Sequence, residues 1–162
     1  MHISTDGQLV QEDFRIMTPI DQFPDYLVWA NKRCLEMVSS VECPEAETIL
    51  KHILDAEAIW AHRIKGESYV RSEDPPDIKS FSGRIEENAA LYASIISICA
   101  HDRIISYQNL SGVPFDSKLS DIILQVCFHD AYHRGQIFQC IKQKGGEELD
   151  TDYILFTRSL SS

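Results

Sequence analysis

With 162 residues, 44% of them hydrophobic and 25% charged, the chain has the length and composition of one globular domain with a full core. We therefore predict a single domain over residues 1–162. The formal net charge of −10 disfavours binding to nucleic acid or to an anionic membrane surface, and no run rich in lysine and arginine offsets it.

The cysteine content and the N-terminus predict a cytoplasmic protein. The five cysteines are odd in number, widely spaced and without a Cys-x-x-Cys pair, whereas secreted disulfide frameworks use an even set in a shorter chain. The N-terminus lacks the basic and apolar regions of a signal peptide, and no apolar run reaches the length of about 18 residues that a membrane span needs. We expect reduced thiols and no membrane partner.

The first predicted helix follows a polar, extended lead-in over residues 1–20. From Asp21 onward, apolar residues recur at spacings of three and four as far as Val38. Pro24 suits the first turn of this helix, because proline has no backbone N–H to contribute to the helical hydrogen bonds.

A second and a third helix are predicted on either side of a loop over residues 67–80. The second begins near Cys43 and ends at Gly66, which can adopt a left-handed conformation. Ser82 is predicted to cap the third, which runs to about Ala100. The residues predicted to face inward on the third helix are Ile85, Leu91, Ile95 and Ile98.

The last third of the chain predicts a hairpin or irregular excursion, a long helix and a tail. The excursion spans residues 103–118, and Ser120 is predicted to cap the helix that follows and ends at Gly145-Gly146. One face of this helix carries Ile122, Val126, His129, His133, Ile137 and Cys140. Residues 147–162 are predicted to pack as a tail against the helices.

Four amphipathic helices predict an all-α fold, a four-helix bundle with a short irregular or hairpin excursion before the last long helix. The connection over residues 101–119 is longer than a tight turn, so a simple up-down-up-down order is not required.

The most informative residues are His129 and His133, four apart in the last predicted helix. Four helical residues correspond to roughly 400° of rotation and about 6 Å of rise, so both imidazoles leave one face of the helix a turn apart. Such a pair suits two ligands of one metal ion, although an ion held by protein alone normally has three or four ligands.

His52 is the third candidate ligand. It lies on or beside the apolar stripe of the second predicted helix, between Ile49 and Ile53, so it can meet the His129 and His133 face across the core. The competing interpretation is a core histidine with an ordinary hydrogen-bond partner, in which no ion binds. Burying several imidazoles without partners is costly, which favours the metal interpretation.

The other histidines are not predicted to join the site. His2 is terminal, His62 lies about 80° around the helix from His52, and His101 falls at a helix end. Each is expected to be solvated or to cap a helix.

The histidine pair differs from that of a zinc metalloprotease. The His-Glu-x-x-His motif has a glutamate general base directly after the first ligand, and here that position is Asp130, one methylene shorter. Asp130 and Tyr132 are also predicted to point about 100° away from their histidine neighbours. A protease of this type is therefore not expected.

Other residues close to the histidines have weaker predicted roles. Asp55 is one turn from His52 and is predicted to be a solvated carboxylate, with orientation of a ligand imidazole as the alternative. Cys140 is predicted to be a small core residue. Arg134 is predicted to pair with a carboxylate or to cap a helix end, and Gly135 to allow close helix approach.

Three motifs occur in an order that is typical of one known family. They are the segment from His52 to Trp60, the run from His129-x-x-x-His133 through Arg134-Gly-Gln-Ile137, and the segment Thr151-Asp-Tyr-Ile154. On these motifs the sequence resembles the DinB-like family, also called YfiT-like, of metal-binding helical bundles. The resemblance runs from about Phe23 to Phe156, nearly the whole chain.

The resemblance implies a four-helix bundle in up-down-down-up order, with its long connection between the second and third helices. It also implies that His52, His129 and His133 hold a divalent metal ion, Zn²⁺ or Ni²⁺. Some relatives are transferases that use a low-molecular-weight thiol, and others have been described as hydrolases, so a small-molecule substrate is expected. Many members form homodimers, which makes a homodimer an expectation here.

Three neutral imidazoles leave at least one coordination position of an ion open, as in catalytic zinc sites. An open position can hold water or a thiol, and the ion favours the deprotonated form of either. The sequence alone does not distinguish a thiol transferase from a hydrolase, and no general acid or base stands out. The alternative is a metal-stabilised binding or stress-response module without turnover.

Overall fold

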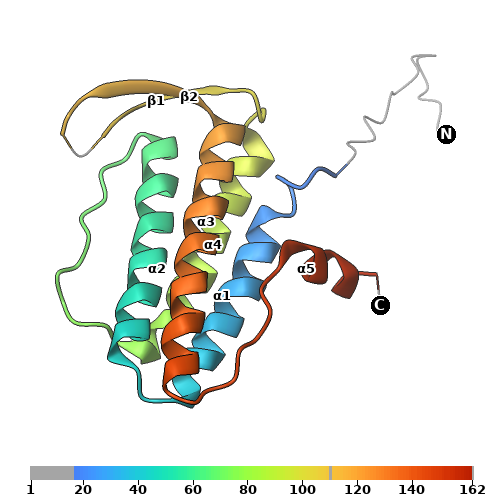
Figure 1. The fold of residues 1–162 in the computed structure, drawn as a ribbon. Coiled ribbons are helices and arrows are strands. Elements are labelled where there is room, and N and C mark those ends of the chain that lie inside the picture. The colour runs from blue at the N-terminus through green and yellow to red at the C-terminus, as the bar shows by residue number, and fades with distance from the viewer. Residues whose placement is uncertain (1–16, 110, 162) are drawn as a thin grey trace, which may run out of the picture.

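The computed structural model describes residues 17–109 and 111–161, and it shows a mostly helical protein with one small antiparallel sheet (Figure 1). In chain order the elements are α1 (Phe23–Ser40), α2 (Pro44–Lys65), α3 (Ile78–Ile98), β1 (Ile104–Gln108), β2 (Pro114–Lys118), α4 (Leu119–Gln143) and α5 (Tyr153–Ser159). The mainly helical prediction is confirmed, and the excursion before the last long helix is a β-hairpin.

The four long helices pack side by side, with α1 and α4 running in one direction and α2 and α3 in the other (Figure 1). The most extensive contacts join α2 to α4 and α1 to α3, and α2 also packs on α3. The connection over residues 66–77 returns the chain from the C-terminal end of α2 to the level of its N-terminal end, so that α3 runs parallel to α2 (Figure 1).

Apolar side chains fill the interior in two clusters, and a layer of polar side chains lies between them. One cluster includes Phe23 and Tyr92, and the other includes Leu50 and Ile137. The intervening polar residues, all buried, are Asn31, Glu57, Asn88, Asp130 and Arg134. Each long helix contributes to this layer, and hydrogen bonds from Asn31 of α1 and Asn88 of α3 join those helices to Glu57 of α2.

The first two helices end close to their predicted limits. Proline occupies the first turn of both α1 and α2, and Gly66 ends α2 with a φ of 73°. α1 begins at Phe23 instead of Asp21, because the Asp21 carboxylate accepts hydrogen bonds from the backbone N–H and hydroxyl of Thr18 in a preceding turn. Of the predicted lead-in, residues 1–16 lie outside the described residues, and the remainder enters this turn instead of staying extended.

The prediction that Ser82 caps α3 is wrong. The helix begins at Ile78, and its cap is Asp77, whose carboxylate accepts a hydrogen bond from the backbone N–H of Lys79. Ile98, predicted to face inward, is 79% exposed at the end of α3. The inward stripe contains Asn88 and Tyr92, and the pattern of aliphatic residues alone does not reveal them.

The prediction that Ser120 caps α4 is also wrong. α4 begins at Leu119, directly after β2, and the backbone N–H groups of Leu119 and Ser120 donate to the carbonyl oxygens of Arg103 and His101. These bonds satisfy donors that a capping side chain would otherwise serve. At its other end α4 stops at Gln143, just before the predicted glycines.

The C-terminal tail packs against α1, as predicted. Phe156 of α5 is buried against Tyr26 and Trp29 of α1, and the Tyr26 hydroxyl donates a 2.8 Å hydrogen bond to the carbonyl oxygen of Thr151. Within the described part of the chain, no helix combines the length and the apolar character that crossing a membrane requires.

Candidate metal centre

Three histidines from two helices meet at one place in the structure. His52 extends from α2, and His129 and His133 extend from α4 one turn apart, each offering a ring nitrogen within 4.8 Å of the others. The Nε2 atoms of His52 and His129 lie 3.2 Å apart. The ring centroid of His133 lies 4.6 Å from that of His52 and 4.5 Å from that of His129. The predicted convergence is confirmed, and it results from the packing of α2 on α4.

Acceptor groups on α4 face the other ring nitrogen of two of these histidines. Nδ1 of His133 lies 2.7 Å from Oε1 of Gln136, and Nδ1 of His129 lies 3.4 Å from Oδ1 of Asp130. An acceptor beside Nδ1 favours the tautomer with its proton there, which leaves the lone pair of Nε2 available. The role of Gln136 was not predicted, although Gln136 follows His133 by one helical turn.

The surroundings of the site favour neutral imidazoles. Partial burial lowers the pKa of His52, and the neighbouring His133 and His129 lower it further. Burial also lowers the pKa of His129, against an opposing effect of Glu57. A protonated ring nitrogen has no lone pair for a metal ion, so these shifts favour the form that can act as a ligand.

The three nitrogen donors fit a divalent ion such as Zn²⁺. Bonds of about 2.1 Å in a tetrahedral arrangement place neighbouring nitrogens about 3.4 Å apart, close to the 3.2 Å between the Nε2 atoms of His52 and His129. The cluster contains no cysteine or carboxylate. Three neutral ligands would therefore leave one position of a four-coordinate ion open to solvent or to a small molecule.

A cleft opens beside the histidines, between α2, α4 and the connection over residues 66–77. Its volume is about 510 Å³, and its lining includes His52, His133 and Gln136 on one side and residues 71–76 on the other. The Nζ atom of Lys51 donates a 2.7 Å hydrogen bond to the carbonyl oxygen of Ser72 and so holds this connection against α2. The cleft brings a small molecule within reach of the histidines.

Asp55 is not the solvated carboxylate that was predicted. Its side chain is buried, and its two oxygens bind Lys51 at 3.0 Å and Arg84 of α3 at 2.5 Å. The same contacts show that Asp55 does not orient a ligand imidazole, because both oxygens face cations. Two cations near one aspartate make burial of this carboxylate tolerable and fix α3 against α2.

A buried carboxyl pair that was not predicted lies behind the histidines, formed by Glu57 of α2 and Asp130 of α4. Asn31 and Asn88 donate hydrogen bonds of 2.6 Å and 2.8 Å to the two Glu57 oxygens. Burial raises the pKa of Glu57 well above its usual value, and Asp130 raises it further. Burial raises the pKa of Asp130 to about 7, against a lowering effect of Arg134. A signal existed in the sequence, because Glu57 lies four residues after Ile53 on the inward stripe of α2.

Arg134 and Gly135 have surroundings different from those predicted. Arg134 is buried, donates a 2.8 Å hydrogen bond from Nη2 to the Tyr26 hydroxyl and lies over the Tyr26 ring, with no carboxylate oxygen within 4.0 Å among the described residues. A Cβ atom added at Gly135 would meet nothing within 4 Å, so this glycine does not serve close helix approach. Cys140 is half-buried against an apolar cluster, in partial agreement with its predicted core position.

The remaining described histidines stay apart from the cluster. Nδ1 of His62 lies 2.9 Å from a carboxylate oxygen of Glu67, and Nε2 of His101 lies 3.3 Å from one of Asp21. His2 lies outside the described residues. Tyr132 is 66% exposed, and its ring contacts that of His133 edge to face, nearer to the site than predicted.

The chain matches a known protein family. The family model described as the DinB family matches residues 17–160, almost the entire described chain. Neither the curated proteins nor the solved structures contain a significant match to the chain.

Proposed function

The chain belongs to the DinB family, and from this premise we propose that it is a cytoplasmic, metal-dependent enzyme acting on a small molecule. His52, His129 and His133 would hold Zn²⁺ or Ni²⁺ through their Nε2 atoms. The observation that carries the proposal is the approach of three imidazoles from two helices to within 4.8 Å of one another.

A bound ion would act as a Lewis acid that lowers the pKa of water or of a thiol at its open position. The chain's own groups prepare that position. Gln136 favours the Nδ1–H tautomer of His133, and partial burial keeps His52 and His129 neutral. Lys51 holds the connection that forms the far wall of the cleft.

Thiol transfer is the reaction class that these groups support better than hydrolysis. Hydrolysis commonly uses a carboxylate as a general base close to the bound water, and Asp55 and Asp130 are both buried and bonded to other groups. Glu73 and Asp74 line the cleft, but they bond with Arg71 and Ser72 in the connection itself. A thiol bound to an ion at this site would release its proton to the solvent in the open cleft, so thiol transfer would not require such a base.

We also propose a helix order and an oligomeric state for the chain. We assign the four long helices to a single-domain bundle in up-down-down-up order, and we expect the homodimer that the family resemblance implies. Sedimentation equilibrium of the metal-loaded protein tests the second expectation, which a monomer at all concentrations would contradict.

The test of the metal site compares two histidines of the same helix. The His52→Ala variant should lose bound metal and any turnover together, whereas His62→Ala should keep both, because His62 bonds with Glu67 away from the cluster. Elemental analysis of protein purified without a histidine tag measures the metal. A panel of cellular thiols paired with electrophiles measures turnover.

Each outcome of this comparison has one meaning. Equal metal content in His52→Ala and the unmodified protein would contradict the metal site. If His52→Ala loses metal and melts at a lower temperature, but the unmodified protein consumes no thiol, the result would contradict thiol transfer and favour a metal-stabilised binding module.

A further inference from the structure

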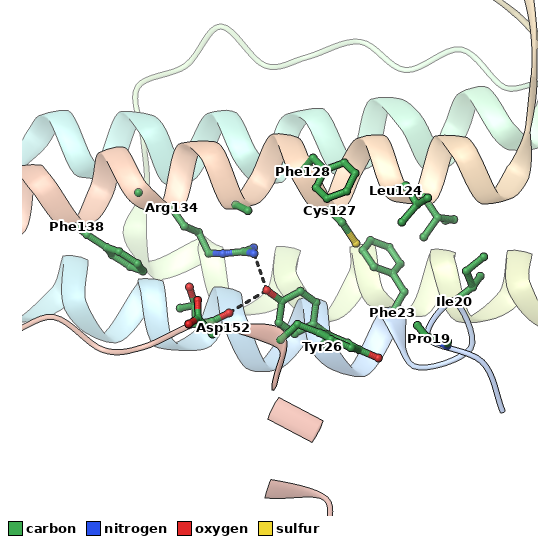
Figure 2. Close-up of a pocket in the computed structure, with 15 residues that line it drawn as sticks. Pro19, Ile20, Phe23, Tyr26, Leu124, Cys127, Phe128, Arg134, Phe138 and Asp152 are labelled. Carbon is green, nitrogen blue, oxygen red and sulfur yellow. Dashed lines mark hydrogen bonds between the residues drawn. The ribbon is translucent and has the colours of Figure 1, made fainter. Parts of the chain in front are cut away.

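A second pocket lies between α4, α1 and the C-terminal tail (Figure 2). None of the three clustered histidines lines it. Its volume is about 450 Å³, within the range of pockets that hold small ligands. Apolar side chains make up most of its lining, including Phe23 of α1 and Leu124, Phe128 and Phe138 of α4. Phe128 is 69% exposed, so its ring is accessible to a molecule in the pocket.

Arg134 is the cation of this pocket. It extends from α4 toward Tyr26 of α1 (Figure 2) and is only 3% exposed. Its Nη2 atom donates to the Tyr26 hydroxyl, but its Nε atom is buried without a hydrogen-bond partner among the described residues. Buried cations are normally paired with an anion, so this guanidinium has donor capacity that the described protein groups leave unused.

We propose that this pocket binds an apolar molecule that carries a carboxylate, with Arg134 receiving the carboxylate and the aromatic lining receiving the apolar body. The planar guanidinium matches the two oxygens of a carboxylate, and such charge-assisted bonds strengthen where water is excluded. This proposal is independent of the metal site, because it uses different side chains of α4.

The other polar groups around the pocket leave Arg134 as the group that would bind the carboxylate of a ligand. The Tyr26 hydroxyl already donates to the Thr151 carbonyl oxygen and accepts from Arg134, so it offers no further proton to a ligand. Asp130, one turn before Arg134, has its carboxyl turned to Glu57 in the polar layer. Asp152 also lines the pocket, but it is exposed, so water screens its negative charge.

The pocket and the histidines face different directions although they share a short stretch of α4. Consecutive residues of a helix project about 100° apart, and His133 and Arg134 are consecutive. The linings of the pocket and of the histidine cleft have no residue in common. A ligand in one can therefore be distinguished from a ligand in the other by substitution.

The test titrates the full-length, metal-loaded protein with decanoate below its micellar concentration, using isothermal calorimetry. 1-Decanol and decyltrimethylammonium are the controls, because they keep the chain and replace the carboxylate by a neutral or a positive group. Decanoate should bind at least about tenfold more tightly than either control, the ratio expected for a charge-assisted hydrogen bond. Equal affinity for the three probes, or no binding of decanoate, would overturn the proposal.

Two substitutions locate the binding. Arg134→Gln should weaken decanoate binding about tenfold or more while leaving 1-decanol binding unchanged. Gly135→Leu places a side chain in the pocket where a Cβ meets nothing within 4 Å, and it should abolish binding even where Arg134→Gln does not fold. Its matched control is Gly83→Leu, because Gly83 of α3 also has open space around its Cβ and does not line the pocket.

Two further measurements distinguish this pocket from the metal site and from a subunit interface. His52→Ala should bind decanoate as the unmodified protein does, and loss of binding there would show that the carboxylate binds the metal instead. Sedimentation of the protein with and without decanoate detects a second copy on this surface. A dimer that Phe128→Asp dissociates, in a protein that does not bind decanoate, would overturn the proposal in favour of a subunit interface.

Discussion

His133 and Arg134 are neighbours in the sequence, yet they lie in opposite settings. His133 faces α2 and the cleft, partly open to solvent, with two other imidazoles close by and Gln136 at its Nδ1. Arg134 faces α1 and is buried beside aromatic and aliphatic side chains. One helix therefore presents a neutral, lone-pair-rich cluster on one face and a single cation on the other. The first suits a metal ion, and the second suits an anion.

Apart from Arg134, the polar layer consists of Glu57, Asp130, Asn31 and Asn88. Its hydrogen bonds join α1, α2 and α3 at the level of the histidines. A buried network that is nearly complete holds its members in one arrangement, because any shift leaves a polar group unpaired. We expect this layer to fix the helix positions on which both sites depend.

The largest effect is expected from Glu57→Leu. The substitution removes the acceptor of the Asn31 amide and one of the two acceptors of the Asn88 amide, which keeps the Leu54 carbonyl oxygen, so it should lower the free energy of unfolding by about 3 kcal/mol. Glu57→Gln is the matched variant. Oδ1 of Asn31 is buried with no hydrogen-bond partner among the described residues, and a flipped Asn31 amide would accept from the new Gln side chain. Urea denaturation of metal-free protein should show a much smaller loss for Gln, and equal losses would contradict this role of the layer.

The pH dependence of the same variants follows from the raised pKa values. The pKa values of Glu57 and Asp130 are higher in the folded than in the unfolded chain, so the folded state holds more protons. The stabilisation is present at low pH and is lost as the pH rises through about 7, the folded value for Asp130. Glu57→Gln leaves one carboxyl, so between about pH 5 and pH 7 its stability should fall less steeply, by up to about 1.4 kcal/mol per pH unit. A parallel profile for both proteins would contradict a raised pKa of Glu57 in the folded chain.

Gln136→Ala tests whether Gln136 orients His133 for metal binding. Without the acceptor at Nδ1, His133 is free to rotate and to change tautomer, so the affinity for Zn²⁺ should fall about 10- to 100-fold. The exposed Gln139 of the same helix provides the control variant Gln139→Ala. Competition with a chromophoric chelator measures both, and unchanged affinity in Gln136→Ala would exclude an orienting role.

The smallest effect is expected from Gly135→Ala on the pocket side. Gly135 lies inside α4 with space around its Cβ, so alanine should raise the free energy of unfolding by about 1 kcal/mol. Gly66→Ala is the opposite case, because its φ of 73° is strained for any residue with a Cβ. Urea midpoints should therefore move in opposite directions, and a loss in Gly135→Ala would mean that this glycine is needed for packing.

Local sequence signals were sufficient to locate the long helices and to predict that His129 and His133 lie on one helix face. The spacing of apolar residues, Pro24, Pro44 and Gly66 located the first two helices within a few residues. The helix caps of α3 and α4 were predicted wrongly, because several residues near each start can cap a helix. The connection before α3 places Asp77 at the start of that helix, where its carboxylate caps it. α4 begins where the carbonyl oxygens of His101 and Arg103, just before the hairpin, accept hydrogen bonds from its first backbone N–H groups.

The sequence by itself determined that His129 and His133 share a helix face, because a helical period involves only residues a few positions apart. Only the tertiary structure decided what lies opposite each face. Glu57 meets Asn31 and Asn88 across 26 and 31 positions, and Arg134 meets Tyr26 across 108. Such contacts depend on how whole helices pack. For this reason the pair of candidate ligands His129 and His133 could be proposed from spacing, and His52 from its apolar stripe and the family resemblance, whereas the polar layer and the pocket of Arg134 could not be predicted.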